Sequence, residues 1–260
     1  MMSLLNLIAM LFIGSFAGVI IGVMGASGAV IMVSLLYLLL GFSMHEAIGT
    51  TLMASFIASS VVAYVYYKNE NVDVLPCLWL AFGAFPGSQL GAFISFNTPD
   101  SELRSIFGIL LIALGAYLFR EREESIIKKF ERIHIKNEKY RYAMAIIIGF
   151  VVGVIASVFG ASGGIWFLAI LFLIFSMPLH KAVGGAAFLM ALTALFATIA
   201  HARYGNVDFI AATIVGIGAA ITGNISAKFA NKAAEKLLMK AVAALLIALG
   251  IFLLILQNMA

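Results

Sequence analysis

A short run of small residues interrupts the apolar N-terminal part of the chain, and the same run occurs again later. Gly25-Ala26-Ser27-Gly28 recurs 135 positions on, from 25 to 160, as Gly160-Ala161-Ser162-Gly163. Glycine tolerates the backbone angles of a helix break, and Ser27 and Ser162 are candidate N-caps of the segments that follow. A helix N-terminus leaves N–H groups unpaired and carries a partial positive charge. The two breaks therefore predict a binding site for a small anion.

Close helix packing through small residues is the alternative function of such glycines. It fits Gly14 and Gly18, with their counterparts Gly149 and Gly153, better than it fits the two breaks. Each break precedes an apolar segment too short to cross a membrane comfortably, which favours a half-helix or one arm of a re-entrant hairpin.

Hydroxyl and amide side chains provide further candidate ligands. Thr50 and Thr51 begin a segment in which Ser55 and Ser59 follow at helical spacing, so these hydroxyls either line a polar path or hydrogen-bond between helices. Gln89 and its counterpart Asn224 are amides in apolar segments and are candidate direct ligands.

Ionisable candidates lie at the ends of apolar segments. His201 and Arg203 end one segment and are candidates for the mouth of a pathway, although Arg203 could instead pair with Asp208. No Asp or Glu lies in the middle of an apolar segment, which argues against a buried-carboxylate proton relay. The sequence has no metal-spaced His/Cys set and no nucleotide loop, so we expect neither an enzyme nor a cofactor.

Composition identifies the solvent in which these residues lie. The chain is 63% hydrophobic and 11% charged, whereas soluble domains carry about 25% charged residues. The apolar runs are continuous rather than alternating, which predicts membrane-spanning helices and not a β-barrel. The net charge of +4 does not indicate nucleic-acid binding, because basic residues cluster between Arg120 and Arg141, where they orient the chain.

Two copies of one unit make up the sequence. At the same offset, His45, Asn71-Val72-Asp73 and Gly83-Ala84 recur as His180, Asn206-Val207-Asp208 and Gly218-Ala219. We therefore predict a first membrane repeat over 1–119, a basic cytoplasmic linker over 120–141 that could form an amphipathic helix, and a second membrane repeat over 142–260.

The positive-inside rule sets the orientation of the two units. An odd number of crossings per repeat, either five or three plus a re-entrant hairpin, places 14 of the 16 Lys and Arg residues in the cytoplasm. The predicted fold is an all-α polytopic membrane protein with two inverted-topology repeats of about five helical segments each, some short or broken. Such repeats are typical of secondary transporters, which bind substrate near the midplane at the repeat interface.

The ordered, doubled motifs resemble the sulfite exporter TauE/SafE family, also called the 4-toluene sulfonate uptake permease family. The resemblance covers about residues 14–119 and 149–254, and it rests on the two breaks and on the following segments: Ala47-Ile48-Gly49-Thr50-Thr51, Gly83-Ala84-Phe85-Pro86-Gly87-Ser88-Gln89-Leu90-Gly91 and Gly205-Asn206-Val207-Asp208. The resemblance implies a multi-pass permease of the prokaryotic inner membrane for sulfite, organosulfonates or related sulfur anions.

The sequence leaves three functions open. The first is a secondary transporter that holds a small sulfur anion at the two breaks, with Thr50, Thr51, Gln89 and Asn224. The second is a permease or channel for another small anion or carboxylate, and the third is a membrane sensor without flux. The expected partners are a small anionic substrate, the lipid bilayer and a coupling ion, either a proton or sodium. The oligomeric state, the direction of transport and the substrate are not determined.

Overall fold

The computed structural model describes residues 4–24, 28–120 and 138–229, and the separate residues 247, 248, 250, 251, 253 and 255. Over these residues the chain is helical except for turns and short connections, and it contains no strand. The continuous helices are: α1 (Leu4–Met24), α2 (Ala29–Leu40), α3 (Met44–Lys68), α4 (Val74–Asn97), α5 (Asp100–Arg120), α7 (Glu138–Phe159), α8 (Gly164–Leu173), α9 (Leu179–Arg203) and α10 (Phe209–Phe229).

The prediction of an all-helical membrane protein is confirmed. Within the described residues, α1, α3, α4, α7, α9 and α10 are long and apolar enough to cross a membrane. Helices α2 and α8 have only 12 and 10 residues. At 1.5 Å per residue they are about 18 and 15 Å long, well short of the roughly 30 Å hydrocarbon core.

Local sequence signals explain several helix ends. Ser43 and Glu46 form a capping box at the start of α3: the Ser43 hydroxyl accepts from the Glu46 N–H, and the Glu46 carboxylate accepts from the Ser43 N–H. Gly41 ends α2 with a left-handed φ of 69°, which glycine adopts without strain. Asp208 caps α10 by accepting from the N–H groups of Ile210 and Ala211.

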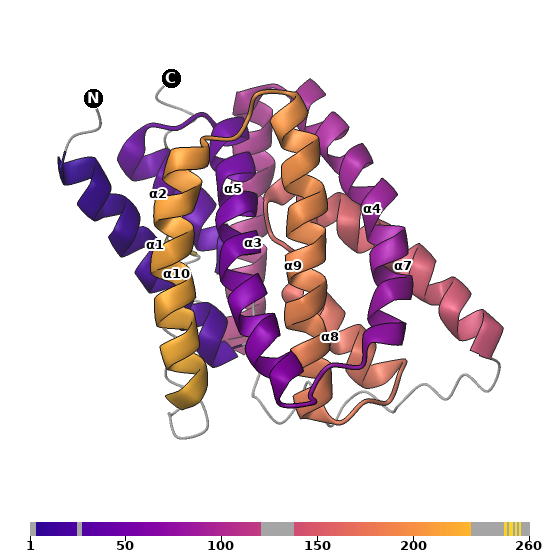
Figure 1. The fold of residues 1–260 in the computed structure, drawn as a ribbon. Helices are drawn as coiled ribbons and strands as arrows, with labels where there is room; N and C mark the ends of the chain where they lie inside the picture. Colours follow the sequence, from indigo (N-terminus) through magenta and orange to yellow (C-terminus); the bar gives the residue numbers. More distant parts are fainter. Residues whose placement is uncertain are drawn as a thin grey trace.

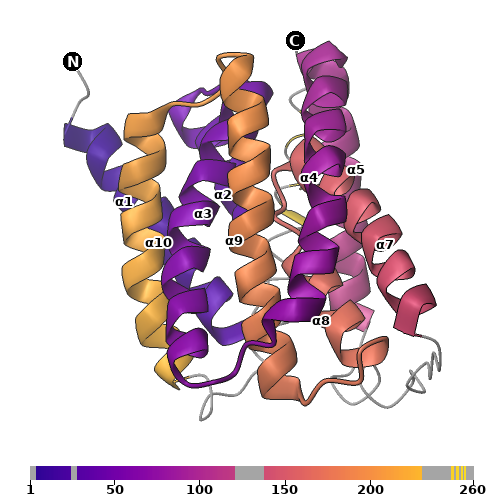
Figure 2. The same ribbon diagram turned by 45° about the vertical axis from the view of Figure 1, so that its right-hand side comes forward.

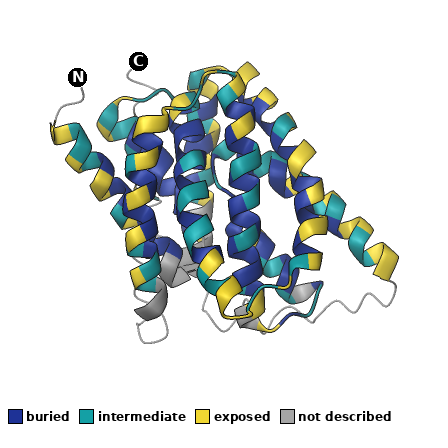
Figure 3. Ribbon diagram, viewed as in Figure 1, coloured by how far each residue is buried: buried dark blue, intermediate teal, exposed yellow. Residues whose placement is uncertain are grey.

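Helices from the two halves of the sequence pair with each other. Helix α1 packs along α10, α4 packs along α7, and α3 and α9 pack together between these pairs, as Figures 1 and 2 show. Helices α3 and α9 are also the most buried of the six long helices. Large apolar side chains are exposed on the outward faces of α1, α4, α7 and α10, where a bilayer would solvate them (Figure 3).

Glycines bring the paired backbones into direct contact, and they do so reciprocally. A Cβ atom added to Gly14 of α1 would overlap the Val215 carbonyl of α10, and one added to Gly149 of α7 would overlap the Leu80 carbonyl of α4. The two contacts are equivalent, because Gly149 and Val215 lie 135 positions after Gly14 and Leu80. The packing role considered for Gly14 and Gly149 is therefore the one that the structure shows.

The two central helices run in opposite directions. Gly49, near the start of α3, lies against Asn206 beyond the end of α9, and Gly184, near the start of α9, lies against Asn71 beyond the end of α3. The α3–α4 connection is at the bottom of Figure 1 and the α9–α10 connection is at the top. This arrangement is consistent with the predicted inverted repeats.

Two parts of the sequence prediction fall largely outside the described residues. Most of the proposed amphipathic helix lies in 121–137, and its last residues, from Glu138 to Arg141, form the first turn of α7. Of the final apolar segment, only the six separate residues are described, and they are helical.

Candidate functional site

The second small-residue break forms a compact left-handed turn between α7 and α8. Gly160, Ser162 and Gly163 have φ values of 65°, 41° and 76°. The Ala161 N–H donates to the Ala156 carbonyl at 3.0 Å and closes the end of α7. A serine with positive φ is an uncommon, strained conformation of the kind found at functional sites.

Ser162 does not cap the following helix, so that prediction is wrong. The N-cap of α8 is Gly163, and no side chain caps this end. The turn continues through Ser162 in the left-handed region and shifts the start of α8 to Gly164, which leaves the N-cap to a residue that tolerates a φ of 76°. The hydroxyl of Ser162 is buried within the turn.

The first break is described only at its last residue. Gly25, Ala26 and Ser27 lie outside the described residues. Gly28 is the N-cap of α2 and has an ordinary right-handed φ of −69°. An added Cβ there would lie 2.5 Å from the Ala17 carbonyl oxygen, so glycine is required by close packing against α1.

The second break lies between the two central helices. A Cβ added to Gly160 would lie 3.0 Å from the Val33 side chain of α2 and 3.4 Å from the Ile48 Cα of α3. At the other end of the turn, a Cβ added to Gly164 would overlap the Met190 sulfur of α9. The turn and the N-terminus of α8 therefore bridge the interface between the two repeats.

The face of α3 that meets this break carries a row of hydroxyls. Ile48, Thr51, Ser55 and Ser59 are spaced by three or four residues, so they lie along one side of the helix. Thr51 and Ser55 have no exposed surface and Ser59 has 1%, yet none of the three hydroxyls has a hydrogen-bond partner. We call Thr51, Ser55 and Ser59 the hydroxyl row.

Three other buried hydroxyls of the bundle are satisfied within their own helices. Ser34, Ser88 and Thr198 donate to the carbonyl four residues earlier at 3.0, 2.5 and 2.7 Å. The alternative that Ser55 and Ser59 hydrogen-bond between helices is wrong, because neither has any partner. A buried hydroxyl without a partner lowers the stability of the fold by about 1–3 kcal/mol. A polar group bound at the row would offset this loss.

Thr50 lies about 100° around α3 from its neighbour Thr51. Its hydroxyl accepts from the Asp208 N–H at 3.0 Å. Ala54 and Ile57, which share this side by their spacing, pack around Gly216 of α10. Of the two threonines predicted as ligands, Thr50 bonds the start of α10, and Thr51 lies on the same side of α3 as Ile48, which contacts the break.

The structure does not bring Gln89 and Asn224 together. The Gln89 side chain donates to the Phe196 carbonyl at 3.2 Å and accepts from Arg203 at 3.2 Å, so both ends of its amide are occupied. Asn224 is half-buried on α10, next to Gly223, which faces Gly18 of α1. The two amides thus lie on different outer helices, and the Gln89 amide is bonded to the central helix α9.

The two mouth candidates on α9 have different environments. Arg203 is exposed and donates to Gln89, so the alternative pairing with Asp208 is wrong; the Asp208 carboxylate instead caps α10. His201 is fully buried, and its Nε2 bonds the Ser157 carbonyl of α7 at 2.9 Å. The two residues are two positions apart and lie on different sides of α9, so the cation is exposed while the imidazole is buried.

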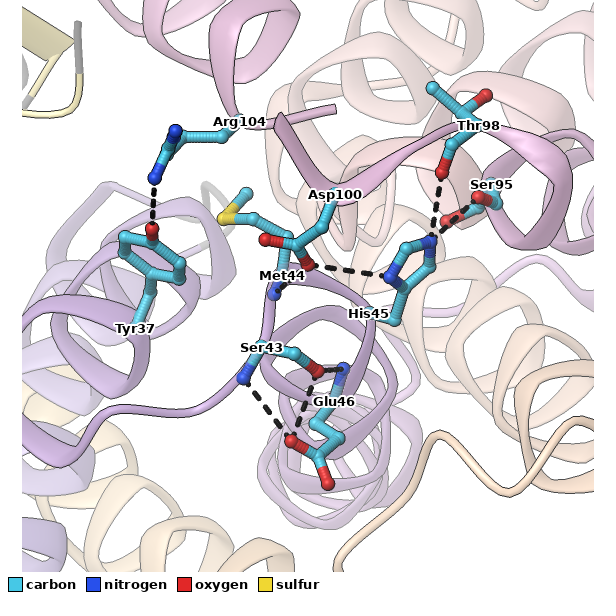
Figure 4. A network of polar contacts seen from close by, with 9 residues as sticks. All are labelled: Tyr37, Ser43, Met44, His45, Glu46, Ser95, Thr98, Asp100 and Arg104. Carbon is cyan, nitrogen blue, oxygen red and sulfur yellow. Dashed lines mark hydrogen bonds and ion pairs between the residues drawn. The ribbon is translucent and has the colours of Figure 1, made fainter. Parts of the chain in front are cut away.

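A second histidine organises the same end of the molecule (Figure 4). The Nε2 of His45 lies 3.0 Å from the Ser95 carbonyl and 3.1 Å from the Thr98 carbonyl, and its Nδ1 lies 3.4 Å from the Asp100 carboxylate. Asp100 also accepts from the Met44 N–H at 2.7 Å. This network ties the start of α3 to the connection between α4 and α5.

Sequence reasoning missed four buried polar side chains. Unpartnered polar atoms also occur in Ser95, Ser157, Thr193 and Asn206. The three hydroxyl residues are single polar residues in apolar helices without a repeated spacing, so the sequence offers no signal that separates them from packing residues. Within the described residues, no three His, Cys, Asp or Glu side chains are placed to hold a metal ion.

The apolar spanning helices, the crossed pairing of the two halves and the buried polar interface define a multi-pass membrane protein of the transporter class. The family model for sulfite exporter TauE/SafE matches residues 10–253. The chain therefore belongs to the TauE/SafE family of membrane transporters.

Curated relatives agree with this assignment. The chain is 27% identical to the probable membrane transporter protein YunE of Bacillus subtilis (strain 168), over 95% of this chain and 96% of that protein. It is 25% identical to a probable membrane transporter protein of Xylella fastidiosa (strain 9a5c), over 96% of each chain. The probable membrane transporter protein YdhB of Bacillus subtilis (strain 168) is 25% identical over 82% of this chain and 86% of its own. No solved structure matches the chain significantly.

Proposed function

We propose that the protein is a secondary permease for small sulfur-containing anions such as sulfite or organosulfonates. The proposed site is the second break, from Gly160 to Gly163, together with the hydroxyl row of α3. The first break, from Gly25 to Gly28, would approach from the other repeat. The contact of the second break with Ile48, on the side of α3 that carries three buried, unpartnered hydroxyls, is the observation that carries the proposal.

The chemistry of this site suits an oxyanion. The first-turn amides of α8 have no acceptor within the helix, and their N–H groups carry the positive end of the helix dipole. Hydroxyls of Thr51 and Ser55 can each donate to an anionic oxygen. A sulfite or sulfonate group presents three oxygens and can accept from amides and hydroxyls at once. No full positive charge needs to be buried in the bilayer for this arrangement.

The position between α3 and α9 suits alternating access. These helices belong to different repeats and run in opposite directions, so a movement of one repeat against the other would open the site to each side in turn.

Anion-induced thermal stabilisation of the purified full-length protein tests the proposal. Sulfite, sulfate, sulfoacetate, taurine and chloride are compared at equal ionic strength. We expect stabilisation by sulfite or a sulfonate and none by chloride. Absence of stabilisation by every anion would refute the proposed function, and stabilisation by chloride alone would indicate a different anion pathway.

Matched variants locate the site. Thr51→Val and Ser55→Ala remove hydroxyls from the row and should reduce the anion-induced shift. Ser88→Ala removes a buried serine that is satisfied within α4, so this control should keep the shift. Bulky replacement of both Gly25 and Gly160 should abolish binding; a normal shift in that double variant would place the site elsewhere.

A further inference from the structure

Three buried and unpartnered polar atoms lie where α4, α7 and α9 converge: Ser95 Oγ, Ser157 Oγ and His201 Nδ1. All three residues have no exposed surface. None of them belongs to the hydroxyl row or to either break. They form a second buried polar cluster, here called the serine–histidine cluster.

Contacts between the helices hold the cluster together. The ring of His201 bonds the backbone of Ser157 at 2.9 Å. A Cβ added to Gly91 of α4 would lie 2.8 Å from the Ser157 Cβ, so the Ser157 side chain is directed at α4. Ser95 lies one helical turn beyond Gly91 on the same face of α4.

The hydrogen bond of His201 determines which ring nitrogen is available. A carbonyl oxygen only accepts, so Nε2 of His201 must carry a hydrogen to bond Ser157. In the neutral ring, Nδ1 is therefore an acceptor without a donor. Adding a proton turns Nδ1 into a third donor beside the two serine hydroxyls, and three donors on three helices suit an oxyanion.

The charged and titratable groups around the cluster come from three elements. Helix α3 contributes His45, which interacts electrostatically with His201, and α5 contributes Asp100, which pairs with His45. Both ring nitrogens of His45 already face acceptors (Figure 4). Beyond His201 on α9, Arg203 is bound to Gln89 and Tyr204 stacks on Phe96 with ring centroids 4.4 Å apart. The stretches of α4 and α7 that adjoin the cluster, 88–97 and 150–159, contain no titratable side chain.

We propose that the serine–histidine cluster binds one oxyanion together with one proton, which is taken from water and held on His201 Nδ1. This inference rests on the proposed function and names its coupling ion. The empty cluster keeps a neutral ring, because an uncompensated cation buried in the bundle is costly. An oxyanion bound to the two serines supplies the compensating charge, so anion binding and protonation of His201 strengthen each other. Each anion that passes the cluster is then carried with a proton.

Calorimetry on the full-length protein in nanodiscs tests this coupling. The probe is methanesulfonate, which stays fully ionised and takes up no proton itself. Titration at pH 7 in buffers of different ionisation enthalpy gives the number of protons bound with the anion. We expect about one proton per anion, and an affinity that weakens about tenfold for each unit of rising pH. This wild-type measurement requires no variant to fold.

Variants assign the proton to one histidine. His201→Gln should bind methanesulfonate without proton uptake, whereas His45→Gln should retain the uptake. Ser95→Ala combined with Ser157→Ala should weaken binding about tenfold or more while proton uptake remains. Melting temperatures in the absence of anion verify that each variant is folded.

The outcomes separate this inference from the proposed function. Methanesulfonate binding without proton uptake overturns the inference and leaves the proposed function standing. Uptake that persists in His201→Gln and disappears in His45→Gln also overturns it. No binding of methanesulfonate by the wild type overturns the inference, whereas the proposed function fails only if none of the anions compared above stabilises the protein.

Discussion

Helices α3 and α9 hold equivalent places at the centre of the molecule, but only α3 has hydroxyls at the three positions of the hydroxyl row. At the positions of the hydroxyl row, Thr51, Ser55 and Ser59, helix α9 has Ala186, Met190 and Ala194. Met190 packs on Gly164 at the start of α8, whereas the corresponding positions of the first repeat hold Ser55 and Ala29. The second half of the chain fills this place with a large apolar side chain, whereas the first half has two small residues, of which Ser55 is polar.

The scaffold around these helices is far more symmetric than the site. Gly49 and Gly184 make reciprocal backbone contacts. The turns after α3 and α9 each contain the equivalent hydrogen bond: the Asn71 N–H donates to the Tyr66 carbonyl at 3.0 Å, and the Asn206 N–H donates to the His201 carbonyl at 3.2 Å. Residues that set backbone distance are thus alike in both copies, while residues that face the interface differ. The packing of the helices depends on the positions of the glycines, which are alike in both halves. The polarity of the interface depends on the other side chains, which can differ between the two halves.

The largest effect is expected where the frame is symmetric. Gly49→Val and Gly184→Val each drive a side chain into a backbone carbonyl that cannot move without displacing its helix. We expect each to destabilise the fold by more than about 4 kcal/mol, measured by thermal unfolding and yield. Gly223→Ala, where the nearest atom to an added Cβ is at 3.3 Å, is the mild control. If only one of the two valine variants is destabilised, the backbone contacts of Gly49 and Gly184 are not equally close.

The next effect contrasts the two equivalent positions at the interface. Met190→Ala leaves a cavity beside α8 and should cost about 2–3 kcal/mol. Ser55→Ala removes an unpartnered buried hydroxyl and should be neutral or slightly stabilising. Chemical or thermal unfolding of both variants measures the difference. Equal destabilisation would mean that Ser55 has a structural partner after all.

Neighbouring threonines on α3 test the assignment of its two sides. Thr50→Val leaves the Asp208 N–H without its acceptor and should cost about 1–2 kcal/mol, with anion binding retained in the folded fraction. Thr51→Val should leave stability unchanged and reduce anion binding. Unfolding and anion-induced stabilisation are measured on the same samples. The reverse pattern would exchange the roles of the two residues.

The smallest effect concerns the repeated aspartates that start α10 and α4. Asp208 accepts from two backbone N–H groups, whereas the Asp73 side chain caps nothing at the start of α4. Asp208→Ala should therefore lower stability by about 1 kcal/mol and Asp73→Ala by much less. Melting temperatures are sufficient for the comparison, and a larger loss for Asp73→Ala would contradict it.

The sequence was sufficient to predict the helices, because these depend on apolar length. The inverted repeats, predicted from the fixed offset and the basic residues, are consistent with the antiparallel central helices. It also identified the second break as a place where the chain departs from a helix. It could not separate Thr50 from Thr51, since a spacing of one residue says only that they lie on different sides of α3. Nor could it assign the partner of Arg203, because Gln89 is 114 positions away in the chain.

The polar clusters were decided by tertiary structure. Ser95 and Ser157 stand in unrelated segments, and they become neighbours only because Gly91 lets α4 and α7 approach closely. The same packing buries His201, which the sequence places near a helix end. Periodicity and composition determine where helices form and that a bilayer surrounds them. The contacts between helices determine which of their polar side chains remain unpaired inside.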